Sequence, residues 1–133
     1  MTSEAAIIER IQFDLRGPGG DWETIFEDVL GESLLVFKNR HRSIREMFNA
    51  NIAKWASREF LVLGDRRITY QELKSCVEST AYSMQTQCGI KQGDRVAILG
   101  ANSPEWVISF FAATHLGAIV SALNGWWTET EIR

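Results

Sequence analysis

The stretch from Arg95 to Trp127, RVAILGANSPEWVISFFAATHLGAIVSALNGWW, constrains the fold of this chain more than any other. Two apolar runs, Val96–Leu99 and Ala118–Leu123, flank a segment with a helical pattern. A strand, a helix and a strand at this spacing predict a βαβ unit with parallel strands. Because both runs are almost continuously apolar, we expect the sheet to be covered on both faces. The sequence therefore predicts an α/β fold.

The helix between these strands has clear start and stop signals. Ser103 is a good N-cap, Pro104 suits the first helical position, and Gly117 can end the helix in a left-handed conformation. From Trp106 onward the helix is apolar almost all round, which predicts burial on most sides. We therefore expect Trp106 to be a core residue, and its replacement by Ala to cost roughly 3–5 kcal/mol of stability.

The preceding elements can be predicted from capping and turn signals. Capping boxes of the S/T-x-x-E type predict helices after Ser43, running to about Ser57, and after Thr69, running to Cys88 and Gly89. Between them, residues 60–63 and 66–70 flank Gly64-Asp65 and predict a β-hairpin. Further upstream the expected elements are a short amphipathic helix (4–15), a glycine-rich break (16–20) and a short strand (34–37). We divide the chain into an N-terminal lead segment and linker, 1–42, and an α/β part, 43–133.

Charge and composition exclude some classes of function. The net charge of −3 argues against a nucleic-acid partner, which needs a basic face. No apolar run approaches the ~20 residues of a membrane-spanning helix, and the N-terminus does not resemble a signal peptide. One basic cluster precedes the first capping box: Lys38, Arg40, His41, Arg42 and Arg45. It is interpreted either as an anion site or as a solvated turn that pairs with the acidic segment 21–32, and the pattern favours the turn.

The two cysteines are not predicted to form a disulfide. Cys76 and Cys88 fall on one expected helix, about 18 Å apart along its axis, whereas a disulfide needs Cα atoms within about 7 Å. This predicts a reduced, cytoplasmic chain. Cys76 lies on the apolar stripe, which favours a packed small hydrophobe over a nucleophile. With no CxxC and two histidines, no metal site is predicted.

No catalytic or cofactor-binding residue can be identified from the motifs. The turn Gly100–Glu105 is where many α/β folds hold phosphate, but Pro104 lacks an N–H and Glu105 places a negative charge there. His115 ends a buried helix, which favours interaction with the helix dipole over a role as a base. Trp126 and Trp127 could line a ligand-binding site, but an aromatic pair after a strand more often belongs to the core, and we favour the core interpretation.

Four segments in order resemble the AMP-forming adenylate ligases, the acyl-CoA synthetase superfamily. They are ITYQELKS (68–75), GIKQGDRVAIL (89–99), ANSPEWVISFFA (101–112) and LGAIVSALNGWW (116–127). The Asn-x-Trp-Trp ending looks most like the fatty-acid-type CoA ligases. The resemblance implies the N-terminal part of the ligase fold, and it covers little of residues 1–40.

The resemblance implies an activity for the family that this chain alone does not carry. Such enzymes use ATP and Mg²⁺ to convert a carboxylic acid to an acyl-adenylate and then transfer the acyl group to coenzyme A. The family's phosphate loop ending in Pro-Lys-Gly, its Thr-Glu motif, its ribose-binding Asp and its catalytic Lys have no counterpart here. We therefore expect this chain to contain no catalytic residue, no cofactor-binding residue and no metal-binding residue. We also expect the chain alone to be inactive.

Two hypotheses remain open. The first is the truncated N-terminal part of a fatty-acyl-CoA ligase; the second is a stand-alone, non-catalytic interaction module. Thr128 and Glu131 start a third capping box just before the sequence ends, which favours a longer protein. On the first hypothesis, apolar surface around Trp126-Trp127 and one sheet edge should face water, so that the chain alone self-associates or is only marginally stable at micromolar concentration.

Overall fold

The computed structural model describes residues 4–132 and divides the chain into two compact units, Met1–His41 and Arg42–Arg133. Each unit has its own secondary structure and is described by itself. None of the helices among the described residues is both long and apolar enough to cross a lipid bilayer.

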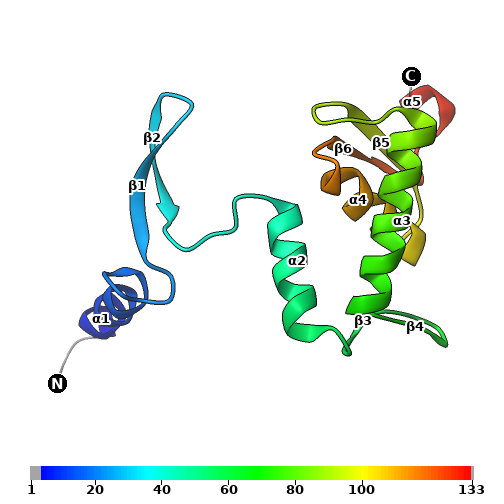
Figure 1. Cartoon of the computed structure of the whole chain (residues 1–133). Helices are drawn as coiled ribbons and strands as arrows, with labels where there is room; N and C mark the ends of the chain where they lie inside the picture. The colour runs from blue at the N-terminus through cyan, green and yellow to red at the C-terminus, as the bar shows by residue number, and fades with distance from the viewer. Residues whose placement is uncertain (1–3, 133) are drawn as a thin grey trace. The chain divides into compact units, whose positions relative to one another are not determined.

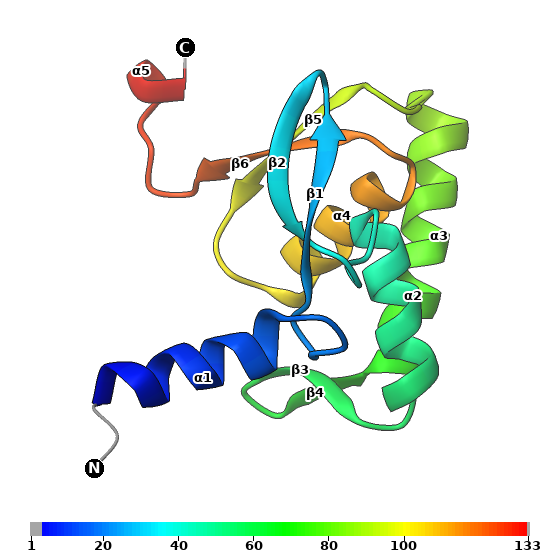
Figure 2. The same ribbon diagram turned by 90° about the vertical axis from the view of Figure 1, so that its left-hand side faces the viewer.

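The first unit, which we call the N-terminal unit, contains one helix and one hairpin (Figure 2). Helix α1 (Glu4–Arg16) is followed by antiparallel strands β1 (Thr24–Val29) and β2 (Glu32–Phe37). Leu30 and Gly31 join the strands with φ of 57° and 89°, the conformation that suits a two-residue hairpin. The helix and the strand at 34–37 confirm the prediction. Strand β1 was not predicted, because Glu27 and Asp28 hide its apolar residues within an acidic segment.

The second unit, which we call the α/β unit, holds the remaining elements (Figure 1). They are α2 (Ile44–Trp55), β3 (Glu59–Leu63), β4 (Arg66–Thr69), α3 (Tyr70–Cys88), β5 (Arg95–Gly100), α4 (Pro104–His115), β6 (Ile119–Asn124) and the single turn α5 (Glu129–Ile132). Strands β3 and β4 form the predicted antiparallel hairpin, and β5 and β6 are parallel neighbours joined by α4. The predicted βαβ unit is therefore confirmed.

Helix ends follow the predicted capping residues, with one difference. Thr69 and Glu72 form a complete capping box, and Gly89 ends α3 in the left-handed conformation with φ of 70°. Ser43 Oγ accepts the N–H of Glu46 at 3.1 Å, but the Glu46 carboxylate accepts the N–H of Arg42 at 2.6 Å. Ser43 therefore caps α2 as predicted, while Glu46 reaches one residue further back than in the standard box.

The core of the α/β unit lies between the three long helices and the β3–β4 hairpin. Helix α3 packs against α4, and α2 packs against both. The buried cluster comprises Phe48, Ile52, Ile68, Leu73, Val77 and Ile108. Phe111 of α4 stacks on Phe48 of α2, with ring centroids 4.6 Å apart, and meets Phe60 of β3 edge-on at 6.1 Å. Aromatic contacts thus join the helices to the hairpin.

The parallel pair β5–β6 is covered on one face by the described residues. Helix α4 packs against both strands, and Ile98 is buried. Leu99 and Ile119 are exposed, each with about half of its surface accessible (52% and 54%). Cover on the second face therefore stays a prediction, and the exposure of Leu99 and Ile119 agrees with the exposed apolar surface expected on the first hypothesis.

Candidate functional site

The carboxyl edge of the β5–β6 pair is where an open α/β sheet usually binds ligands. The two strands end side by side at Gly100 and Asn124, which are register partners. A cavity of about 440 Å³ opens at this edge. It is lined by Gly100, Ala101, Asn102, Trp106, Leu123, Asn124, Gly125 and Trp126.

Gly125 lets the two strand ends approach each other closely. A Cβ atom on Gly125 would lie 2.9 Å from the carbonyl carbon and oxygen of Gly100, closer than real Cβ contacts allow. After it, the N–H groups of Trp126 and Trp127 donate to Asn124 Oδ1 and Asn124 O, each at 3.0 Å. The Asn-Gly pair was predicted only to close the strand; its packing role depends on a neighbour 25 residues away and has no local signal.

A carboxylate of the chain itself occupies the N-terminal end of α4. Ser103 caps the helix by accepting the N–H of Trp106 at 3.2 Å. Glu105 pairs with Arg66 of β4, and this guanidinium holds the pKa of the Glu105 carboxyl below its usual value. An anionic ligand at this turn would meet the negative charge of Glu105. This geometry agrees with the interpretation of the Gly100–Glu105 turn as structural.

The tryptophans near this edge differ in environment. Trp106 is half-buried and stacks on Phe110, with centroids 5.8 Å apart. Trp126 is 91% exposed and Trp127 is 41% exposed. The interpretation of the Trp126-Trp127 pair as core is therefore wrong for the described residues, whereas the exposed apolar surface expected around these tryptophans on the first hypothesis is observed. Trp106 is less buried than predicted.

A second cavity, of about 510 Å³, lies on the surface between α3 and α4. Its lining residues are Ser75, Cys76, Ser79, Thr80, Glu105, Ile108 and Ser109. Cys76 is exposed, so its assignment as a packed hydrophobe is wrong: the buried stripe of α3 runs through Leu73, Val77 and Ala81. Ser75 and Ser109 donate their hydroxyl protons to helix carbonyls at 3.3 and 2.8 Å. Neither hydroxyl donates to a general base, which a nucleophilic serine would need. Both thiols are free, and Cys76 and Cys88 share α3 as predicted.

The surroundings of His115 disfavour its charged form. Its Nδ1 is buried with no hydrogen-bond partner among the described residues. Burial lowers the pKa of His115, and the charges of Arg45 and Lys74 act in the same direction, against the opposing charge of Glu78. A dominant interaction with the helix dipole would raise this pKa. Burial and the two neighbouring cations oppose the effect that a helix dipole would have on this pKa, and the dipole interaction itself stays a prediction.

Two residues of the basic cluster form ion pairs with the acidic segment 21–32. Lys38 contacts Glu23 at 2.9 Å and Arg40 contacts Glu27 at 3.0 Å. Arg45 Nη1 lies 3.4 Å from the carbonyl oxygen of His115. These contacts support the interpretation of Lys38 and Arg40 as a paired turn. Among residues 4–132 there is also no group of three or more His, Cys, Asp or Glu side chains placed to hold a metal ion.

Comparison with known families decides what this scaffold is. The model of the family described as AMP-binding enzyme matches residues 48–133, almost the whole α/β unit. This chain belongs to the AMP-binding enzymes. These are the adenylate-forming ligases, and the match covers their N-terminal part. The family resemblance drawn from the four sequence segments is confirmed.

Individual relatives span more than one substrate class. The chain is 31% identical over 112 residues to the 4-coumarate–CoA ligase CCL1 of Humulus lupulus, covering 83% of this chain and 20% of that protein. It is 33% identical over 91 residues to the medium/long-chain-fatty-acid–CoA ligase FadD6 of Mycobacterium tuberculosis, covering 68% and 15%. This AMP-binding enzyme chain thus spans a fifth or less of the length of these two relatives.

A solved structure gives the same placement. The N-terminal subdomain of NpsA from Klebsiella oxytoca, in complex with 3-hydroxyanthranilyl-AMSN, superposes with a TM-score of 0.66 at 29% identity. The match covers 69% of this chain and 23% of that one. The α/β unit therefore has the fold of the first part of an adenylation enzyme's N-terminal subdomain, as predicted from sequence.

Proposed function

We propose that this chain serves as the first part of the N-terminal domain of an ATP-dependent acid–CoA ligase. The overall reaction would convert a carboxylic acid, ATP and coenzyme A to acyl-CoA, AMP and pyrophosphate. The observation that carries the proposal is the family match over 48–133, the region that forms the buried core and the βαβ unit. The role of the chain within such an enzyme is to build one side of the sheet.

Within this family we propose a fatty acid as the substrate. The Asn124-x-Trp126-Trp127 ending supports it, as does the similarity to a medium/long-chain-fatty-acid–CoA ligase. The similarity to 4-coumarate–CoA ligases supports the competing class, an aromatic acid. This chain has no identified substrate-binding residue, so it does not itself distinguish between the two acids.

ATP, Mg²⁺ and coenzyme A are proposed as cofactors and co-substrates of the complete enzyme, with no ligand to any of them from this chain. The residues at the most favourable position do not fit a nucleotide phosphate, because Glu105 and its partner Arg66 occupy the N-terminal end of α4. The described part of the chain also offers no acidic cluster for a metal ion. We propose a cytoplasmic location, consistent with two free thiols.

The test is carboxylate-dependent exchange of pyrophosphate into ATP. The protein encoded by the reading frame continued past Arg133 is compared with residues 1–133 alone, using octanoate to stearate and 4-coumarate as acids. We expect exchange with fatty acids for the longer protein and none for residues 1–133, because the chain lacks the groups that stabilise transition-state charge. Exchange with 4-coumarate and with no fatty acid would show that the substrate is an aromatic acid instead of a fatty acid. A stop codon after Arg133, together with a stable folded product, would support the stand-alone module instead.

A further inference from the structure

One face of the parallel pair β5–β6 is open to water. In register, Arg95 pairs with Ile119 and Leu99 with Leu123, and the side chains of paired residues lie on the same face of the sheet. On this face Leu99 and Ile119 are 52% and 54% exposed, whereas Ile98, which points the other way, is buried on the side where α4 packs. Parallel sheets occur almost only with both faces covered. We call the face that carries Leu99 and Ile119 the open sheet face.

The outer edge of β5 has free backbone groups. The carbonyl oxygen of Asp94 accepts the N–H of Ile119 at 2.8 Å, and in a parallel ladder alternate residues face the neighbouring strand. Val96 therefore directs its N–H to β6, whereas Ala97 and Leu99 direct theirs outward. Within the described part of the chain β5 pairs with β6 alone. An edge of this kind is a ready template for another strand.

The handedness of parallel connections relates this edge to the open sheet face. A strand–helix–strand connection between parallel strands is right-handed in almost all proteins. Helices of connections that continue past β6 would therefore lie on the same face as α4. A helix that leads to a strand beside β5 lies on the opposite face. Of the two directions of growth, only growth beside β5 brings a helix over Leu99 and Ile119. The first strand of such a unit is likewise an interior strand in both common doubly wound strand orders.

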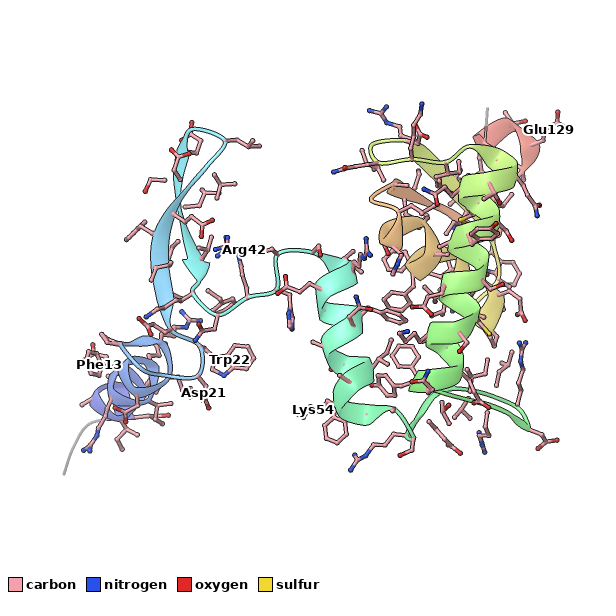
Figure 3. All side chains as sticks on the ribbon, viewed as in Figure 1. Phe13, Asp21, Trp22, Arg42, Lys54 and Glu129 are labelled. Atoms are coloured by element: carbon pink, nitrogen blue, oxygen red, sulfur yellow. The ribbon has the colours of Figure 1, made fainter. Side chains whose placement is uncertain are left out.

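We propose that β5 is an interior strand of a larger sheet, paired along its outer edge with a further parallel strand of the same polypeptide, whose connecting helix covers the open sheet face. This inference rests on the function proposed above, in which the chain is the first part of a ligase domain. Beyond β6 the chain turns at Gly125 and begins α5, which contains Glu129 (Figure 3). The match to the NpsA subdomain covers 23% of that chain, so a relative of this fold has ample length for the strand and the helix.

A second copy of this chain fits the edge less well. A closed dimer that pairs two β5 edges about an axis perpendicular to the sheet makes the two strands antiparallel and places both α4 helices on one face. Leu99 and Ile119 of both copies then stay in water. A strand and helix of the same polypeptide satisfy the free N–H groups and the open sheet face together.

Hydrogen–deuterium exchange, read at single residues by mass spectrometry, tests the pairing. Residues 1–133 are compared with the protein encoded by the reading frame continued past Arg133. We expect the N–H groups of Ala97 and Leu99 to exchange at least 100-fold more slowly in the longer protein, whereas the N–H of Val96, the matched control, is protected in both. Equal exchange of Ala97 and Leu99 in the two proteins would overturn the proposal. A stop codon after Arg133 would also overturn it, as would protection of Ala97 in residues 1–133 that grows with concentration, the sign of a second copy.

Thiol labelling tests the cover separately, in a background with Cys76→Ser and Cys88→Ser. Ile119→Cys lies on β6, away from the proposed new strand, so its protection reports the helix alone. We expect maleimide to label Ile119→Cys at least tenfold more slowly in the longer protein. Leu30→Cys is the matched control at a fully exposed hairpin tip and should react equally in both proteins. Equal labelling of Ile119→Cys in the two proteins would overturn the proposed cover.

Neither measurement depends on catalysis, so failure of this inference differs from failure of the proposed function. Slow exchange at Ala97 without exchange of pyrophosphate into ATP would reject the ligase activity and support the strand pairing. Exchange of pyrophosphate with Ala97 unprotected would support the activity and reject the pairing.

Discussion

The two units differ in how they bury their apolar residues. In the α/β unit, Leu73 and Val77 are completely inaccessible at the junction of three helices and a hairpin. The N-terminal unit is also rich in apolar residues, yet none of its described residues is buried. Apolar content alone therefore does not produce a core. Residues distant in sequence must be brought together, and in this chain the βαβ unit and the long helix α3 do so.

The largest difference between the units should appear when one Leu in each is shortened. Leu73→Ala should destabilise the α/β unit by about 2–5 kcal/mol, the range for a Leu removed from a closed core. Leu35→Ala in the N-terminal unit should cost less than about 0.5 kcal/mol in a dilute monomeric sample. Urea denaturation followed by circular dichroism measures both. Similar losses from the two variants would show that the N-terminal unit has a core of its own.

Two tryptophans allow the same comparison within the α/β unit. Trp106 is half-buried and stacked on Phe110, so Trp106→Ala should cost about 2 kcal/mol, less than the 3–5 kcal/mol expected from sequence. Trp126→Ala, at a residue 91% exposed, should cost less than about 0.5 kcal/mol. Chemical denaturation of residues 1–133 compares them. A larger effect of Trp126→Ala would mean that the carboxyl edge is closed in solution.

These differences show where sequence reasoning succeeded. The βαβ unit, the hairpin at β3–β4 and the helix ends at Thr69, Ser103 and Gly89 follow local signals, because caps, turns and periodicity act over a few residues. The family resemblance rests on the same region. The exposure of Cys76 could not be predicted in this way, since it depends on which distant residue packs on the side chain. The exposure of Trp126 was expected only on the hypothesis of a truncated chain, and the local pattern alone favoured a core position. Strand β1 was missed because its acidic residues masked the alternation.

Gly125 gives a test of a contact that had no local signal. A Cβ at Gly125 would collide with Gly100, so Gly125→Ala should destabilise the α/β unit by about 1–3 kcal/mol, as overpacking does. Gly100→Ala is the matched control, because the nearest atom to its Cβ would be Trp106 Cδ1 at 3.9 Å, an ordinary contact. Thermal denaturation should therefore show a lowered midpoint for Gly125→Ala only. Equal midpoints for the two variants would show that the close packing of the strand ends does not require glycine at position 125.

The smallest expected effect is a pH dependence confined to the α/β unit. The pKa of His115 is lowered in the folded state, first by burial and then by Arg45 of α2 and Lys74 of α3, while Glu78 of α3 opposes the shift. Near pH 6.5, the ordinary value for His, the unfolded chain therefore binds more protons at this residue than the folded chain. The contribution of His115 to stability is complete above this pH and is lost as the pH falls from about 6.5 through the lowered folded value.

The measurement is urea denaturation between pH 5 and pH 7.5 in a His41→Gln background, which leaves His115 as the only histidine. His115→Gln should flatten the part of the profile near pH 6.5, because glutamine cannot take up the proton. Carboxylates such as Glu72 and Glu105, whose pKa values are lowered, lose their contribution at lower pH and should keep that part of the slope in both proteins. An unchanged profile would mean that the buried Nδ1 of His115 is solvated in solution. The junction of α2, α3 and α4 would then be looser than the rest of the core.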